Sequence, residues 1–117
     1  MKARRWILYV FVFVAVPVLS TAQHIVREFD APGPLSRGLA WDGQYLWCAD
    51  AMRDSIYKID PTTGQVVHSI FFDFNTSYGG GITWAGDEAL WVTRAQYFYK
   101  LRVSDGQGLA NFHCPGG

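Results

Sequence analysis

The sequence has little charge of either sign and few side chains that bind metals or act as nucleophiles. Its 117 residues contain three histidines, two cysteines and two glutamates, and ten Lys and Arg balance ten Asp and Glu. No basic patch for a polyanion is present, so we expect no nucleic-acid partner. The histidines do not have the spacing of a zinc site, and no G-x-S-x-G nucleophile motif occurs. We therefore expect neither a bound metal nor a cofactor.

The sequence also lacks an apolar run of the roughly 20 residues that a membrane-spanning helix needs. Its longest run covers residues 6–19, behind the basic residues Lys2, Arg4 and Arg5, and a small-x-small motif ends at Ala22. This order is typical of a secretory signal peptide, with cleavage after Ala22. We expect a secreted or periplasmic protein, whose mature part has seven Lys and Arg against ten Asp and Glu, a net charge of −3.

Cysteine is scarce, and the two present allow two interpretations. In an exported chain, Cys48 and Cys114 are candidates for a disulfide. Cys48 also occupies the place that Val92 holds in a repeat described below, where a small buried apolar side chain is sufficient. The sequence leaves open whether the two cysteines are bridged.

An internal duplication is the strongest feature that is present. The segment Gly38–Trp47 (GLAWDGQYLW) recurs as Gly81–Trp91 (GITWAGDEALW), and the triplet 57–59 (YKI) recurs as 99–101 (YKL). The offsets are 42 to 44 residues, and a period of about 40–45 residues built from short strands is typical of β-propeller blades. The sequence therefore predicts an all-β protein with two four-stranded antiparallel propeller blades, which form an incomplete ring.

Each copy divides into four short strands. The predicted strands are 38–41, 45–49, 55–59 and 66–72 in the first copy, and 81–84, 89–93, 97–102 and 109–112 in the second. Asp42-Gly43 is expected to form a two-residue hairpin turn. The second strand of each copy is apolar at successive positions, as expected for a sheet buried on both faces between neighbouring blades. Glycine at the start of each copy suits an innermost strand, where the backbones of blades approach closely.

The mature chain is predicted to begin with a strand that has no blade to join. Residues 24–29 read as an outer strand, and the second copy ends where a third blade would begin. The predicted units are therefore a signal peptide (1–22), an isolated outer strand and linker (23–34), blade 1 (35–75), and blade 2 with the start of the next blade (76–117). Either the gene is truncated or several chains self-associate to complete one ring.

Residues 35–113 resemble exported bacterial β-propellers of the YVTN/NHL type. The motifs are G-L-A-W-D-G-x-Y-L-W-x-A-D from Gly38 and I-Y-K-I-D-P-x-T-G-x-V from Ile56. The repeat is also similar to that of plant-type glutamine cyclotransferases, which are five-bladed propellers. The latter resemblance implies attack of an N-terminal amine on a glutamine side-chain amide, assisted by an acid in the central cavity. The two glutamates, Glu28 and Glu88, do not match such an acid, and Glu88 lies in a hairpin on the opposite rim.

Ligand-binding residues are expected in the loops of one rim of the propeller. These loops join each second strand to the third and each fourth strand to the next first strand. The polar and aromatic side chains there are our candidate ligand-binding residues: Arg37, Asp50, Arg53, Asp54, Tyr78 and Arg94. The group around Arg53 would suit a polar ligand, whereas solvated turn charges are the alternative.

The sequence does not identify the ligand. Tryptophans recur at equivalent places in the repeat, and they fit blade packing better than a sugar platform, although both remain open. We expect an exported binding or scaffold module that takes a small molecule, a glycan or a protein on its rim. The alternative is a fragment or subunit of a glutamine cyclotransferase-like enzyme.

Overall fold

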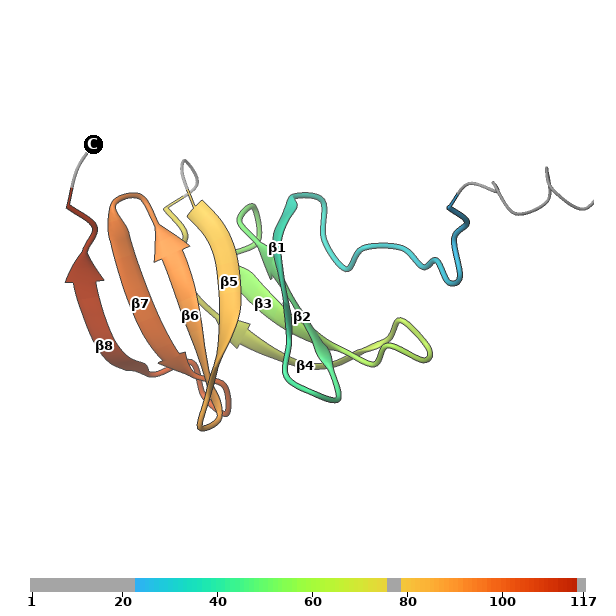
Figure 1. The fold of residues 1–117 in the computed structure, drawn as a ribbon. Helices are drawn as coiled ribbons and strands as arrows, with labels where there is room; N and C mark the ends of the chain where they lie inside the picture. Colours follow the sequence, from blue (N-terminus) through green and yellow to red (C-terminus); the bar gives the residue numbers. More distant parts are fainter. Residues whose placement is uncertain (1–22, 76–78, 116–117) are drawn as a thin grey trace, which may run out of the picture.

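The computed structural model describes residues 23–75 and 79–115, which form two four-stranded antiparallel sheets (Figure 1). The predicted signal peptide and Tyr78 lie outside the described residues. Blade 1 consists of β1 (Ser36–Trp41), β2 (Leu46–Asp50), β3 (Ser55–Ile59) and β4 (Val66–Phe71), in that spatial order. Blade 2 consists of β5 (Gly79–Gly86), β6 (Ala89–Arg94), β7 (Tyr97–Arg102) and β8 (Gly108–His113). The prediction of an all-β chain with two such blades is confirmed.

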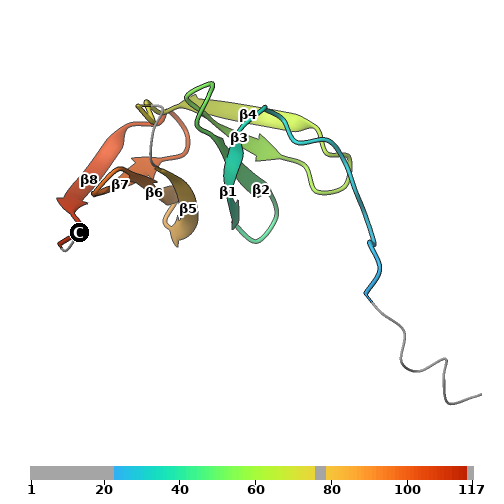
Figure 2. The same ribbon diagram turned by 90° about the horizontal axis from the view of Figure 1, so that it is seen from above.

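The two blades lie face to face and fan apart from their inner strands. β1 and β5 are neighbours, while β4 and β8 lie on the far edges (Figure 2). β3 and β7 have the predicted bounds, and the other strands differ by one or two residues at one or both ends. No helix that could cross a membrane is found among the residues described.

The core lies between the blades, as the apolar second strands predict. Trp47, Ile56 and Phe74 of the first half and Leu90 and Val92 of the second are almost completely buried. At about 25 cal/mol per Å² of apolar surface, this layer is the main source of stability. The successive apolar residues of β2 and β6 therefore reflect packing of one blade on the next.

Gly38, the third residue of β1, permits a close approach between the blades. A Cβ on Gly38 would lie 1.9 Å from the carbonyl oxygen of Gly80 and 2.9 Å from the amide nitrogen of Ile82. Both atoms belong to β5, so only a residue without a side chain fits there. The expected crowding of backbones at the inner strand is confirmed at this position.

The hairpin between β1 and β2 is longer than predicted. The connection spans residues 42–45 rather than two residues. The Asp42 carboxylate accepts hydrogen bonds from the amides of Gln44 and Tyr45, at 2.8 and 2.7 Å, and from Trp47 Nε1 at 2.8 Å. The side chain therefore organises a wider turn, and Asp42-Gly43 alone does not form it.

The predicted outer strand at residues 24–29 is wrong for the described structure. These residues form no strand, since they pair with none of the eight strands described. The segment is instead held against blade 1 by Arg27 Nη1, which donates to the carbonyl of Pro61 at 2.8 Å. Phe29 packs against Gly64 in the same turn.

Both cysteines are free thiols. Cys48 is buried in β2 and Cys114 is exposed after β8. The structure therefore supports the interpretation of Cys48 as a small buried apolar residue.

Candidate functional site

The candidate site lies at the rim where β6 ends and where the chain passes from β4 to β5. Arg94 is the last residue of β6, and the passage between the blades begins after Phe71. These two segments lie at the same end of the molecule (Figure 1), opposite the turn between β5 and β6. This is the rim on which the sequence predicts ligand binding.

Arg94 connects the two blades at this rim. Its Nη1 donates a 2.7 Å hydrogen bond to the carbonyl of Asp73 and lies 3.8 Å from the carboxylate of the same residue. Its Nη2 donates to the hydroxyl of Tyr99 at 2.8 Å. The guanidinium group is thus fixed in one orientation, with its charge near an acidic side chain.

Aromatic rings form the other wall of the site. The guanidinium carbon of Arg94 lies 4.7 Å from the centroid of Tyr99, close enough for a cation–π contact. The ring of Tyr97 lies 6.1 Å from that of Tyr99, and Tyr97 is 43% exposed. Together with Asp73, these three residues form what we call the rim site, in a cavity of about 530 Å³ lined also by Phe74, Asn75 and Ala95.

Asp54 positions the passage that carries Asp73. The carbonyl of Asp54 accepts a hydrogen bond from the amide of Phe72 at 3.0 Å, and its carboxylate accepts one from the amide of Phe74 at 2.9 Å. Asp54 adopts a left-handed backbone conformation with φ of 52°, which Asp tolerates better than most residues. Asp54 therefore shapes the rim site from outside its cavity.

Arg37, Arg53 and Asp50, which are described candidates from the sequence, do not line the rim-site cavity. Arg37 is exposed on β1, where its Nη1 is 3.5 Å from the carbonyl of Gly79. Arg53 is exposed in the turn after β2. Asp50 is fully buried, with one carboxylate oxygen accepting from the amide of Met52 at 3.0 Å. Its second oxygen has no hydrogen-bond partner among the described residues, and it lies against Gly33.

Of the predicted residues that the structure describes, only Arg94 lines the cavity. The structure adds Asp73, Tyr97 and Tyr99, which the sequence analysis did not select. Tyr99 corresponds to Tyr57 of the first copy and belongs to a triplet that marks the repeat. Asp73 became a candidate only when hydrogen bonding brought the β4–β5 passage to Arg94, a contact 21 residues apart in sequence.

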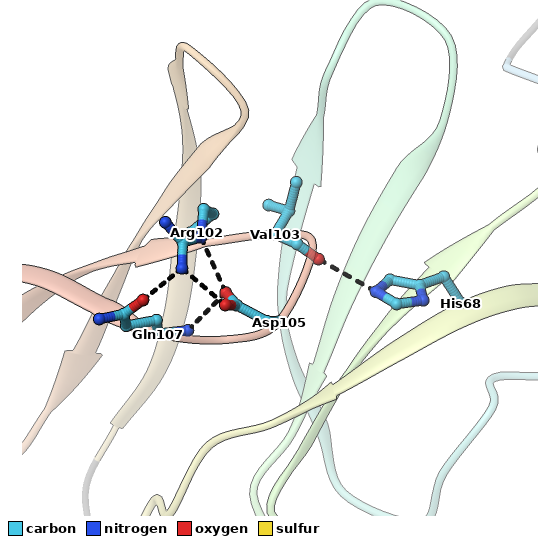
Figure 3. Close-up of polar contacts among 5 residues, drawn as sticks. All are labelled: His68, Arg102, Val103, Asp105 and Gln107. Carbon is cyan, nitrogen blue, oxygen red and sulfur yellow. Dashed lines mark hydrogen bonds and ion pairs between the residues drawn. The ribbon is translucent and has the colours of Figure 1, made fainter.

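The rim site is close to neutral, because Asp73 lies beside Arg94. A second Arg–Asp pair on the opposite rim has closer contacts (Figure 3): Arg102 donates to Asp105 at 3.0 and 2.7 Å. The hydrogen bond from Arg102, followed by that from the amide of Gln107, lowers the pKa of Asp105 to about 2. Arg102 also contacts the side chain of Gln107, so its donors are directed into its own turn. The Arg94 pair, in contrast, borders an open cavity.

The described part of the chain contains no group of three or more His, Cys, Asp or Glu side chains placed to share a metal ion. The carboxylates of Asp50 and Asp54, on either side of Arg53, accept hydrogen bonds from two different backbone amides, those of Met52 and Phe74. The residues that line the rim site offer hydrogen-bonding groups, charge and aromatic faces.

No protein-family model matches this sequence. The chain is 33% identical over 90 residues to an uncharacterized protein, YwhL, of Bacillus subtilis, covering 71% of this chain and 20% of that protein. The chain thus spans about one fifth of the length of this curated relative.

Solved structures show the same architecture. The chain is similar to glutaminyl cyclase from Myxococcus xanthus (TM-score 0.56, 13% identity, 67% of this chain and 32% of that one). It is also similar to a catalytically inactive virginiamycin B lyase from Staphylococcus aureus with quinupristin (TM-score 0.58, 20% identity, 83% of this chain and 33% of that one). The chain is similar as well to a luciferin-regenerating enzyme (TM-score 0.52, 22% identity, 69% of this chain and 30% of that one). These structures are propeller-like, and the chain spans about a third of each, so we conclude that it comprises two blades of a β-propeller.

Proposed function

We propose that this chain is part of an exported β-propeller that binds a glycan at the rim site. The observation that supports this most strongly is the pairing of Arg94 with Asp73 beside the half-exposed ring of Tyr97, within an open cavity of about 530 Å³. That volume is within the usual range for small-molecule sites, roughly 300–1,000 Å³.

The charges favour a neutral ligand over an anion. Asp73 lies 3.8 Å from Arg94 and offsets its positive charge. The pair supplies donors and acceptors side by side, and a sugar hydroxyl both donates and accepts. A tyrosine ring offers an apolar face with a polar edge, which suits the C–H face of a sugar ring.

The proposal of export is supported by the basic residues, short apolar run and small-x-small motif of residues 1–22. A propeller that is secreted or periplasmic would meet extracellular or envelope glycans.

Saturation-transfer NMR with methyl hexosides and disaccharides as probes tests the proposal. We expect Tyr97→Ala and Arg94→Ala each to weaken the binding of a positive probe by at least about tenfold, as loss of a central contact does. Arg102→Ala is the matched control, because it removes an arginine paired with an aspartate on the opposite rim. Failure of every probe to bind, or binding indifferent to both rim variants, would refute the glycan proposal.

The alternative function is acyl transfer of the glutamine cyclotransferase type, within a larger propeller. It is supported by the likeness to glutaminyl cyclase, which at 13% identity concerns the fold. Glu88 lies in the turn between β5 and β6, on the rim opposite the rim site. We expect no cyclisation of a peptide with N-terminal glutamine above the uncatalysed rate. Turnover abolished by Asp50→Asn would favour the enzyme, since Asp50 is the buried acid near the rim site's end of the molecule.

A further inference from the structure

We propose that copies of this chain dock head to tail, so that Trp91 of one copy stacks on Trp41 of the next. This contact would repeat the one that joins blade 1 to blade 2 within the chain. The inference concerns the faces of the blades and does not depend on the rim site or its ligand.

The joint inside the chain provides the template. Trp47 of β2 is 1% exposed and stacks on Trp84 of β5, with ring centroids 6.4 Å apart and planes at 17°. His68 of β4 packs edge-on against Trp47, with centroids 6.5 Å apart. Its Nε2 lies 3.0 Å from the carbonyl of Val103 in blade 2 (Figure 3), and since a carbonyl only accepts, Nε2 donates. Stacking and a hydrogen bond thus join one face of blade 1 to the opposite face of blade 2.

The repeat places one half of this joint on each open face. Trp91 pairs with Lys100 in blade 2 as Trp47 pairs with Lys58 in blade 1. Trp41 pairs with Leu46 as Trp84 pairs with Leu90. Matching registers mean that Trp91 repeats the place of Trp47, and that Trp41 repeats the place of Trp84.

Both halves can be reached from solvent, although Trp91 is partly buried and Trp41 is exposed. On blade 1, Trp41 is 52% exposed and Leu39 is 63% exposed. On blade 2, Trp91 packs against Phe112, which is 52% exposed, beside a cavity of about 410 Å³ that also involves Phe98. Aromatic and aliphatic side chains clustered in this way on a surface mark an interaction site.

The open face of blade 1 also carries the connecting segment that a complete joint needs. In the joint within the chain, Phe72 and Phe74 follow the end of β4 and pack into the core. Phe29-Asp30 stands 43 residues before Phe72-Asp73 in the sequence. Phe29 and Pro32 line a cavity of about 350 Å³ over Leu39 and Ile59 of blade 1. The segment around Phe29 thus lies over the open face of blade 1, in a position comparable to that of the β4–β5 passage beside blade 2.

A second copy is the occupant that these features specify. To repeat the joint, the face that carries Trp41 needs a partner whose tryptophan is equivalent to Trp47. The face that carries Trp91 needs a partner whose tryptophan is equivalent to Trp84. Another copy of this chain supplies both. Because the two faces differ, the contact is heterologous and repeats from copy to copy, until a ring closes or a filament grows.

Complementation between two variants tests this arrangement. Every head-to-tail joint needs one intact Trp41 and one intact Trp91, so Trp41→Ser alone and Trp91→Ser alone should each associate at least about 30-fold more weakly than the unmodified chain. An equimolar mixture can form one intact joint and no more, so it should contain heterodimers. Sedimentation velocity of the full chain at micromolar concentration distinguishes these species, and the rescue by mixing shows that both variants are folded.

Phe71→Ser is the matched control. Phe71 is 71% exposed, and its counterpart His113 contacts Tyr97 and Gln96 within blade 2. This variant should associate like the unmodified chain. The proposal is wrong if the unmodified full chain is a monomer, if its association is unchanged by both tryptophan variants, or if one variant alone forms the dimers of a like-with-like contact.

Discussion

The indole of Trp47 lies nearly parallel to that of Trp84, with an angle of 17° between the ring planes, and this stack helps to join the two blades. Trp47 is also held by Asp42 through a 2.8 Å hydrogen bond from its indole nitrogen. Through the hydrogen bond and the stack, Trp47 links the first hairpin and the core to the second blade.

Replacing Trp47 by alanine should cost about 3–5 kcal/mol in the free energy of unfolding, the range for large aromatic residues removed from a core. Urea unfolding, monitored by circular dichroism, measures this change in the free energy of unfolding. Phe71→Ala is the control for an exposed aromatic and should change the value by no more than about 0.5 kcal/mol. Equal effects of the two substitutions would show that Trp47 is not in the core.

Gly38→Ala should lower the free energy of unfolding by about 2 kcal/mol or more, because overpacking of a tight contact costs roughly 1–3 kcal/mol and here the neighbours are backbone atoms. Gly108→Ala is the matched substitution in β8, where a Cβ would meet nothing within 4 Å. It should leave stability unchanged or raise it by up to about 1 kcal/mol. Thermal unfolding of the two variants in parallel tests the close approach of β1 and β5. A stable Gly38→Ala variant would contradict it.

Most of the fold is predictable from the repeat, because apolar second strands and turn residues recur with a fixed period. The bounds of β3 and β7 were predicted to the residue. The strand expected at residues 24–29 was not, because local propensity cannot supply the neighbouring edge that pairing requires. The first hairpin was predicted too short, because the turn depends on what the Asp42 side chain reaches and not on a dipeptide alone.

Asp54→Ala should weaken probe binding at the rim site and reduce stability by about 1–2 kcal/mol, since it removes the acceptor for the amide of Phe74 and a residue that tolerates positive φ. Asp54→Asn keeps a carbonyl acceptor and the same backbone preference. It should therefore behave nearly like the unmodified chain in the NMR binding assay. If both variants lose binding equally, the charge of Asp54, and not its support of the β4–β5 passage, is what matters.

Acid should remove a contribution of Asp105 to stability. Its pKa is lowered from 3.8 to about 2 in the folded chain, so the contribution is fully present above the unfolded value of 3.8 and is lost as the pH falls toward about 2. The urea midpoint of Asp105→Asn should therefore decline less than that of the unmodified chain over this interval. The difference should shrink in high salt, because the pair is exposed. Identical acid dependence of the two chains would rule out this role.

The candidate site was less predictable than the fold. Arg94 is predictable because it follows the second strand of its copy, in a loop of the expected rim. Its partners Asp73 and Tyr99 come from the β4–β5 passage and from β7, so only folding brings the three side chains together. Asp50 illustrates the opposite error, since a carboxylate in a rim turn suggests a ligand contact but is here buried against Gly33.

Chemical-shift mapping tests most directly whether the rim site binds a sugar. The ¹⁵N-labelled full chain is titrated with methyl α-mannoside and, separately, methyl β-glucoside, and amide shifts are followed by residue. The account predicts that the shifts caused by a binding probe gather at Asp73, Arg94 and Tyr97, and that Tyr97→Ala abolishes them. Shifts centred on Asp42 and Glu88 at the opposite rim, or no saturable shifts with either probe, would contradict it.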